Sequence, residues 1–537
     1  MQNKTVTFLP SGNKIEVSAN ELTIKDAAKL AGVLIELQCG GKGHCGKCRV
    51  TVAGENIPST ALEKKFISKT DLEKGIRLAC QSKVSADITV TIPKKLQPDK
   101  KKLFISAIPA VLNAQHVSDS LGVAIDIGTT TIVGVLVDLK TNKTLSVYAL
   151  TNPQAVHGAD VISRINYVIN TSNGLKLLQS KTIETINEII EHICLELKKK
   201  PETITNISVC GNTTMQHFFI GEDPRSLSVA PYQPPIRGVY KKFNAIKLGL
   251  KANPEAEVYL IPNIAGWVGG DTVGVVLATE MHKSKKIKLA IDIGTNGEMV
   301  LGSKDKMSSA STAAGPCFEG ARISCGMRAA DGAIESVYIA EDGIFWRVIG
   351  RVKAVGICGS ALIDTVAELL KFGIIDETGR IQTKAELEGK VPEVLLKSLI
   401  ENESGNSFQI TENIIVTQRD VRELQLAKAA IHAGIQVLIS EMKIKSADID
   451  EILLAGTFGN YIDKANAQRI GLIPDFALEK VRYVGNAACE GARLVLISDK
   501  AKKEAESVAG FVNYVELSAR NDFQDAFVES MMFKRQQ

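Results

Sequence analysis

The hexapeptide AIDIGT occurs twice in this chain of 537 residues, at Ala124–Thr129 and again at Ala290–Thr295. Each copy joins two apolar runs, in LGVAIDIGTTTIVGVLVDL and in KLAIDIGTNGEMVLG. The pattern predicts a strand, a Gly-Thr turn and a second strand, and a single copy would be an ordinary hairpin. Two identical copies favour two related lobes, because a repeated strand–turn–strand unit is the sign of a duplicated architecture.

The two predicted turns carry the groups that bind a phosphate chain. Backbone N–H groups and threonine hydroxyls in both turns can donate hydrogen bonds to phosphate oxygens. The aspartate of each copy can hold a hydrated magnesium ion from its own side. We therefore expect Mg-ATP to be clamped between the lobes. The expected phosphate-binding and magnesium-binding positions are Asp126, Gly128, Thr129, Thr130, Asp292, Gly294, Thr295 and Asn296.

The repeated turns resemble the phosphate loops of the superfamily of acetate and sugar kinases, Hsp70 and actin. The resemblance implies a two-lobed α/β actin-like ATPase (ASKHA) with ribonuclease H-like lobes, in which a later strand and glycine-rich turn hold adenosine. ILLAGTFGN fits that later segment, with Gly456, Thr457 and Gly459 as the candidates. GICGSALIDTVAELL, which starts at Gly356, resembles the helix that packs one lobe on the other. The sequence has no G-x-x-x-x-G-K-[ST] motif, so a P-loop fold is not favoured.

A second informative stretch is LQCGGKGHCGKCRV at 37–50, which concentrates cysteine and glycine. Cys39, Cys45 and Cys48 have C-x5-C-x2-C spacing, and Cys80 stands alone in RLACQ. Four thiolates bind an iron–sulfur cluster, and glycines let backbone N–H groups approach its sulfides. Zinc is the alternative, but zinc ribbons usually carry two C-x2-C pairs and this segment has one. We expect a [2Fe–2S] cluster, in a setting that resembles adrenodoxin-like ferredoxins.

The flanking patterns predict a small ferredoxin-like domain. VTFLP and KIEVS read as a hairpin, TIKDAAKLAGV as a helix capped by Thr23, and CRVTVAG and ADITVTIP as strands. Strands around one helix match the α+β β-grasp ferredoxin fold. PKKLQPDKK then has the composition of a linker. We predict a ferredoxin-like domain at 1–95, a linker at 96–120 and an ATPase domain at 121–537, with its second lobe beginning near 288.

The bulk composition excludes several other classes of protein. A hydrophobic content of 45% supports buried cores, and a net charge of +4 gives no electrostatic footprint for nucleic acid. The N-terminus has no signal-peptide pattern, and no apolar run is long enough to span a bilayer. We therefore expect a cytoplasmic protein, with no membrane partner.

A cluster and an ATPase in one chain suggest coupled electron transfer. Moving one electron uphill by about 100 mV costs about 2.3 kcal/mol, which an ordinary ferredoxin does not supply. An ATPase can supply it by switching between conformations that a partner binds unequally. A reductive activator is the function that this combination indicates.

The chain resembles the reductive activators of corrinoid proteins, in which a [2Fe–2S] domain precedes an actin-like ATPase. The resemblance also covers NPQAVHGADVISRI, VCGNTTMQHF, NIAGWVGGD and AAGPCFEGARISCGMRAADGAI. It implies ATP-dependent reduction of cob(II)amide to cob(I)amide on a corrinoid protein in a methyl-transfer system, with an external low-potential electron donor. Fuller members carry an extra domain before the ATPase, whereas fewer than thirty residues lie there in this chain, so a homodimer is left open.

Several residues are candidates for the hydrolytic step. Asp292 and Glu298 flank the second turn and can orient the attacking water, and Asp126 can act through magnesium. Glu319 is a weaker candidate. Asp271 is another, although its position favours the N-cap of a helix over TVGVVLATEM.

Three further residues and three other functions complete the expectations. His157 and His217 are interpreted as helix or loop residues rather than cobalt ligands, and Cys317 as a packing residue. An ATP-driven electron donor to another metalloenzyme, a redox-regulated small-molecule kinase and an Hsp70-like redox sensor remain as alternatives.

Overall fold

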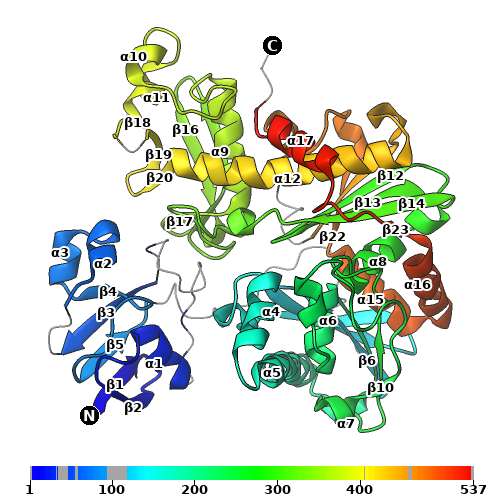
Figure 1. Cartoon of the computed structure of the whole chain (residues 1–537). Coiled ribbons are helices and arrows are strands. Elements are labelled where there is room, and N and C mark those ends of the chain that lie inside the picture. Colours follow the sequence, from blue (N-terminus) through cyan, green and yellow to red (C-terminus); the bar gives the residue numbers. More distant parts are fainter. Residues whose placement is uncertain are drawn as a thin grey trace. The chain divides into compact units, whose positions relative to one another are not determined.

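The structure is a computed structural model that describes residues 3–31, 33, 35, 46, 48–54, 58–93, 118–403, 405–456 and 462–533. Figure 1 draws the helices and strands of the chain. The contacts within the chain divide it into two compact units. One unit holds 1–102 with the short pieces 129–131 and 150–185, and the other holds the remaining residues. Within the described residues, no helix is both long and apolar enough to cross a membrane.

The N-terminal region is a five-stranded sheet with strand order β2-β1-β5-β3-β4. β1 and β2 form an antiparallel hairpin, and β1 pairs in parallel with the last strand, β5. Val6, Phe8, Ile24, Leu78 and Val90 are fully buried between this sheet and α1. The elements are β1 (Asn3–Leu9), β2 (Lys14–Ser18), α1 (Ile24–Leu30), β3 (Arg49–Gly54), α2 (Ala61–Phe66), α3 (Lys69–Glu73), β4 (Ile76–Leu78) and β5 (Ile88–Thr91). This is the predicted β-grasp ferredoxin fold.

The first ATPase lobe is built on a six-stranded sheet with strand order β10-β11-β9-β6-β7-β8. β6 and β7 are apolar on both faces, which suits strands covered by helices on each side. The strands are β6 (Leu121–Ile127), β7 (Thr131–Asp138), β8 (Lys143–Thr151), β9 (Ile204–Gly211), β10 (Phe243–Asn244) and β11 (Glu257–Leu260). The helices are α4 (Val161–Asn170), α5 (Gly174–Glu196), α6 (Thr213–Ile220), α7 (Ala245–Leu248) and α8 (Gly270–Ala278).

The second lobe repeats this plan, with strand order β22-β21-β12-β13-β14-β23. In both sheets an antiparallel meander is followed by a strand that pairs in parallel with its first member, β9 with β6 and β21 with β12. The strands are β12 (Lys288–Ile293), β13 (Gly297–Ser303), β14 (Lys306–Thr312), β21 (Glu451–Ala455), β22 (Val481–Gly485) and β23 (Asn513–Tyr514). This repeated topology confirms the two-lobed ASKHA fold predicted from the duplicated hexapeptide.

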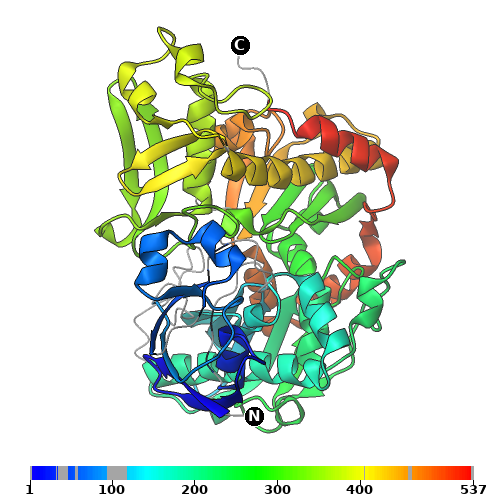
Figure 2. The ribbon, with the colours of Figure 1, turned by 60° about the vertical axis from the view of Figure 1, so that its left-hand side comes forward.

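The helices of the second lobe cover both faces of its sheet. The long helix α12 (Gln418–Met442) packs on β13 and β14, and α17 (Asn521–Ser530) packs on α12 (Figure 2). The remaining helices are α9 (Gly359–Lys371), α10 (Lys384–Leu387), α11 (Glu393–Lys397), α14 (Lys464–Arg469), α15 (Ala487–Ile497) and α16 (Asp499–Phe511). Two small sheets complete the lobe, β15 (Ala333–Ala340), β16 (Gly343–Val348) and β17 (Gly356–Ile357) in one, and β18 (Leu399–Ile400), β19 (Ser407–Thr411) and β20 (Ile414–Thr417) in the other.

The lobes are joined by α8 and α15, whose backbones touch where they cross. A Cβ added at Gly274 would lie 2.7 Å from the Ala488 carbonyl oxygen, and one at Gly491 would lie 2.2 Å from the Gly274 Cα. Glycine at both positions is therefore required for this close crossing. The expectation that the helix after Gly356 packs one lobe on the other is wrong. That helix, α9, packs on β15 inside the second lobe, because its apolar side chains belong to the core there.

Candidate functional site

Four acidic side chains from the two lobes interact electrostatically around the repeated turns. Asp126 and Asp292 are the penultimate residues of β6 and β12, the two strands that carry the hexapeptide. Glu298 is the register partner of Asp292 across the hairpin of β12 and β13, and Asp271 lies in the first turn of α8. The structure therefore brings the three predicted catalytic residues together with a fourth carboxylate.

The surroundings favour the uncharged form of each of these carboxyls. Burial raises the pKa of Asp126, raises that of Asp271 to about 6 and that of Asp292 to about 7, and raises that of Glu298 well above its usual value. The charge of Asp126 adds to the effect on Asp271 and Asp292, and the charge of Asp271 adds to the effect on Asp292 and Glu298. A bound cation stabilises the charged form of half-buried carboxylates that lie close together.

Asp126 is held in place by two side chains from other elements. The Asn486 side-chain amide donates to Asp126 Oδ2 at 2.9 Å, and the Cys210 thiol lies 3.6 Å from Asp126 Oδ1. Asn486 Oδ1 also accepts a hydrogen bond from the Cys489 backbone N–H at 2.9 Å and so caps α15. One asparagine thus fixes both the carboxylate of the first turn and the start of the helix that joins the lobes.

The second turn is closed by contacts of its own. Thr295 Oγ1 donates to Glu319 Oε1 at 2.6 Å, and the Gly315 N–H donates to the Thr295 carbonyl oxygen at 3.0 Å. The Gly294 N–H donates to the Asn296 carbonyl oxygen at 3.0 Å, which makes the turn tight. Glu319, a candidate from the sequence, therefore holds the proton of the turn hydroxyl, and Thr295 can donate to a phosphate oxygen only after it leaves Glu319.

Gly456 places the start of the candidate adenosine turn against the second carboxylate. It follows β21 with φ of +85°, and a Cβ added there would lie 2.4 Å from Asp292 Oδ1. A side chain at this position would displace the carboxylate, so only glycine fits. Thr457 and Gly459 lie outside the described residues.

The first turn is supported through its backbone by the segment NPQAVHGADVISRI. Arg164 is fully buried, and its Nη2 donates to the Thr129 carbonyl oxygen at 2.5 Å. The same guanidinium donates to Gly158 and Gln154 oxygens at 2.9 and 3.2 Å, and the Asn152 N–H donates to the Thr130 carbonyl oxygen at 2.8 Å. Neither Arg164 nor Asn486 is predicted from the sequence. Arg164 lies in NPQAVHGADVISRI, a segment that carries the family resemblance without giving a role to single residues, and Asn486 lies outside every such motif.

Three interpretations of single residues are tested by the structure. The N-cap of α8 is Gly269, so the interpretation of Asp271 as the cap is wrong. Asp271 lies two residues after this cap, where its Oδ1 accepts from the Thr272 N–H at 2.6 Å. His217 is buried within α6, where Nδ1 lies 2.6 Å from the Thr213 carbonyl oxygen, as expected for a structural histidine. Cys317 is also buried in a hydrophobic core, and burial raises its thiol pKa, so it serves as a packing residue.

The acidic cluster does not form a direct metal cage. Among the described residues, no three His, Cys, Asp or Glu side chains are arranged to hold a metal ion together. Magnesium usually keeps several waters and binds through one or two carboxylates plus substrate phosphates. The cluster therefore fits a hydrated magnesium ion that arrives with a nucleotide.

The described part of the cysteine motif forms a buried pair of thiols. Cys48 Sγ and Cys80 Sγ lie 3.2 Å apart, and the two residues are 3% and 6% exposed. The Gln81 side-chain amide lies 3.6 Å from Cys80 Sγ, and the Ala79 N–H donates to the Cys48 carbonyl oxygen at 2.9 Å. Converging thiols with a nearby N–H donor fit an iron–sulfur cluster. Cys39 and Cys45 lie outside the described residues.

Two buried or half-buried charged side chains brace the backbone around this pair. Glu63 on α2 is fully buried, and its Oε1 accepts from the Leu78 N–H at 2.8 Å and from the Ser82 hydroxyl at 2.5 Å. Arg49 donates from Nε to the Gly46 carbonyl oxygen at 3.1 Å and from Nη2 to the Phe66 carbonyl oxygen at 2.5 Å. Helix α2 is thereby tied to the chain on both sides of Cys48 and Cys80.

These features define a class of protein, an iron–sulfur domain combined with a duplicated nucleotide-binding fold. Family models agree with that class. Residues 6–85 match the 2Fe-2S iron-sulfur cluster binding domain, 121–284 match the RACo middle region, and 286–537 match the C-terminal domain of RACo, the ASKHA domain.

Relatives that match most or nearly all of the chain narrow the class to one family. The chain is 32% identical over 590 residues to the corrinoid activation enzyme RamQ of Eubacterium limosum, with 97% of each chain covered. It is 29% identical over 420 residues to the [Co(II) methylated amine-specific corrinoid protein] reductase of Methanosarcina barkeri, with 72% of each covered. The solved structure of a reductive activator for corrinoid, iron-sulfur protein matches with a TM-score of 0.70 and 32% identity, over 99% of this chain and 98% of that one. The chain belongs to the family of reductive activators of corrinoid proteins.

Proposed function

We propose that this protein uses Mg-ATP to drive one electron from a [2Fe–2S] cluster to a corrinoid protein, reducing cob(II)amide to cob(I)amide in a methyl-transfer system. The observation that carries the proposal is the acidic cluster around the repeated turns, which both lobes build in a chain that also pairs two buried cysteine thiols. The first feature suits magnesium nucleotide, and the second suits an electron-transfer centre.

The N-terminal region would bind the [2Fe–2S] cluster. We assign the four ligands to Cys39, Cys45, Cys48 and Cys80, of which the last two already converge at 3.2 Å. When bound, the cluster supplies a one-electron donor of low potential. Glu63 and Arg49 keep the backbone of the ligand segments in place through the hydrogen bonds described above.

The ATPase residues have the task of binding nucleotide and orienting water. Asp126 and Asp292 would hold the hydrated magnesium from opposite lobes, while the turn N–H groups and hydroxyls bind the phosphates. We infer that Asp292 or Glu298, register partners on one hairpin, orients the attacking water. The adenosine would lie on the turn that starts at Gly456 and includes Thr457 and Gly459.

The link between the two activities follows from the crossing of α8 and α15. Asn486 connects Asp126 to the start of α15, and α15 contacts α8 through glycines with no side chain between them. A change in nucleotide at Asp126 can therefore alter the angle between lobes. A corrinoid protein that binds the two angles unequally would be driven through its reduction. An external low-potential donor would then recharge the cluster, and a homodimer is compatible with this scheme.

The cysteine assignment is tested by substitution. The purified protein should carry two irons per chain, and Cys80→Ala should remove most of the iron while ATP binding remains, because the acidic cluster lies on other elements. Iron analysis and nucleotide titration measure the two properties. A wild-type protein that binds one zinc ion in place of iron would contradict the assignment.

A further inference from the structure

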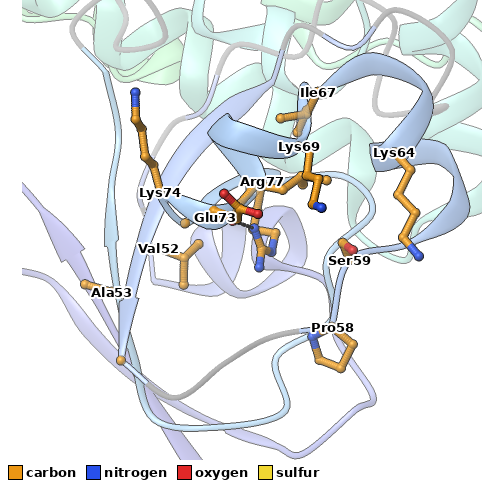
Figure 3. A pocket seen from close by; sticks show the side chains of 13 residues that line it. Val52, Ala53, Pro58, Ser59, Lys64, Ile67, Lys69, Glu73, Lys74 and Arg77 are labelled. Atoms are coloured by element: carbon orange, nitrogen blue, oxygen red, sulfur yellow. Dashed lines mark hydrogen bonds between the residues drawn. The ribbon is translucent and has the colours of Figure 1, made fainter.

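The ferredoxin-like region carries a cleft that the proposed reaction does not use. The cleft has a volume of about 1110 Å³ and is lined by residues of β3, α2, α3 and β4 (Figure 3). Val52, Ile67 and Leu72 form its apolar part. This volume exceeds that of most small-molecule pockets, and the lysines and the glutamate around it are exposed, so a protein surface is the better match.

The rim of the cleft is strongly basic. Lys64, Lys69 and Lys74 line it, from α2, from the first position of α3 and from the turn after α3 (Figure 3). Among the described residues, no carboxylate forms an ion pair with these three ammonium groups. Among the residues that the structure describes, Glu73 is the one acidic residue lining the cleft. The segment 61–77 carries five basic and three acidic residues, and the oxygens of the acidic Glu63 are already used in buried hydrogen bonds.

Two strands that line the cleft, β3 and β4, lead from it to the cysteine pair. β3 begins at Arg49, directly after Cys48, and reaches the cleft at Val52, and the distance from Cys48 to Val52 is about 13 Å along an extended strand. Arg77 lines the cleft and lies three residues before Cys80, and its Nη1 donates to the carbonyl oxygens of Leu72 and Ile76 at 2.8 and 2.9 Å. A partner seated there would lie at the opposite end of the β3–β4 ladder from the two cysteines.

We propose that this basic cleft is the docking site for the electron donor, an acidic one-electron carrier protein. The proposal rests on the proposed function for the need of a donor. In the docked complex the reduced carrier loses one electron, and the oxidised cluster gains it, without any bond or proton being transferred. The unpaired lysines attract an acidic surface, and because surface charges act mainly on association, the cleft should set the rate of encounter.

The test uses the full-length protein with its cluster and a recombinant flavodoxin, an acidic carrier, in its hydroquinone form. Lys64→Glu, Lys69→Glu and Lys74→Glu are combined in one variant. The matched control combines Lys4→Glu, Lys14→Glu and Lys83→Glu, which change the charge equally on other parts of the same domain. Stopped-flow spectroscopy measures cluster reduction without ATP or corrinoid protein, and titration calorimetry measures binding of oxidised flavodoxin.

At low ionic strength the cluster of the cleft variant should be reduced by flavodoxin at least roughly tenfold more slowly than that of the wild type. The variant should also bind flavodoxin correspondingly more weakly. The control variant should change much less, and the difference should shrink as salt is added. Photochemical reduction with a deazaflavin should proceed equally in all three proteins, which shows that the cluster is intact. Equal rates in the cleft and control variants would overturn the proposal.

Two other outcomes would assign the cleft differently and would also overturn it. A cleft variant that accepts electrons normally but fails to pass them to a corrinoid protein would place the corrinoid partner there. A cleft that binds citrate or phosphate while flavodoxin reduction is unaffected would make it a small-anion site. Because the donor assay contains no ATP and no corrinoid protein, its result does not depend on the final acceptor.

Discussion

The same hexapeptide stands at the end of β6 and at the end of β12, but its aspartates have different surroundings. Asp126 receives a hydrogen bond from Asn486 and contacts the Cys210 thiol. Asp292 accepts none from any described side chain, touches the turn of Gly456, and has a pKa raised by burial to about 7. One carboxylate is therefore positioned in advance, whereas the other depends on a cation for its charge. The repeated hexapeptide places the two aspartates at the same position in their strands. Their different tertiary contacts determine how each carboxylate is held and charged.

The largest expected effect comes from removing either carboxylate. Asp126→Ala and Asp292→Ala should each lower ATP hydrolysis by roughly a hundredfold or more, because both would hold the magnesium that stabilises the transferring phosphoryl group. The cluster spectrum should be unchanged in both. Steady-state phosphate release and visible absorption measure the two properties, and undiminished hydrolysis in either variant would make its turn a structural hairpin.

Replacing each aspartate by asparagine should change stability by different amounts, which separates the roles of the two carboxylates. Asp292→Asn removes a carboxyl whose charge burial disfavours, so the metal-free variant should unfold at a higher temperature than wild type near pH 8. Asp126→Asn also replaces the charged acceptor of the Asn486 hydrogen bond by a neutral amide oxygen and should gain less. Thermal unfolding with and without magnesium gives the comparison. Equal shifts in both variants would mean that the hydrogen bonds of Asp126 have no energetic role.

A smaller effect is expected from loosening the positioned carboxylate. Asn486→Ser keeps an N-cap for α15 but removes the amide that donates to Asp126, so stability should change little while hydrolysis falls roughly tenfold. Asn486→Ala also removes the cap and should cost about 1 kcal/mol of unfolding free energy in addition. Denaturant unfolding and hydrolysis assays check the pair of variants. A normal rate in Asn486→Ser would show that Asp126 needs no positioning.

The pH dependence should report Asp292, whose carboxylate accepts no hydrogen bond from any described side chain. In the folded, metal-free protein the pKa of Asp292 is about 7, above its ordinary value of 3.8, so the folded state binds the extra proton. Stability from this group is therefore lost as pH rises from about 4 to about 7. Mg-ATP binding should release protons below pH 7. As the pH is lowered below 7, the affinity for Mg-ATP should fall by about tenfold per pH unit for each proton released. Calorimetry in buffers of different ionisation enthalpy measures the proton count, which should drop in Asp292→Asn.

The sequence predicted the parts of the molecule that repeat or that cluster along the chain. AIDIGT repeats, so the two lobes and their aspartates could be found, and the cysteine spacing led to the pair Cys48 and Cys80. Asn486 could not be found this way, because it meets Asp126 across 360 positions of sequence. The sequence predicts that α9 packs one lobe on the other, which is wrong, because small residues occur in α9 as well as in α8 and α15, the helices that join the lobes. Only the structure shows that Gly274 and Gly491 meet at a crossing.

Local chemistry also misled at one position. Asp271 follows two glycines and precedes an apolar run, which is typical of an N-cap, but α8 begins one residue earlier, at Gly270. The backbone of Gly269 approaches Gly211 so closely that an added Cβ would lie 2.4 Å from its carbonyl oxygen. Asp271 is the second residue of α8 and lies beside the other carboxylates, where its pKa is raised by burial and by Asp126.

The measurement that tests the central claim most directly is the reduction of a cob(II)amide-loaded corrinoid protein by the protein with its cluster already reduced. The appearance of the cob(I)amide absorption is followed with Mg-ATP, without nucleotide, and with Mg-ATP in the Asp292→Ala variant. We predict cob(I)amide with the wild-type protein and Mg-ATP, and little in the other two reactions. Equal yields with and without Mg-ATP would contradict the account.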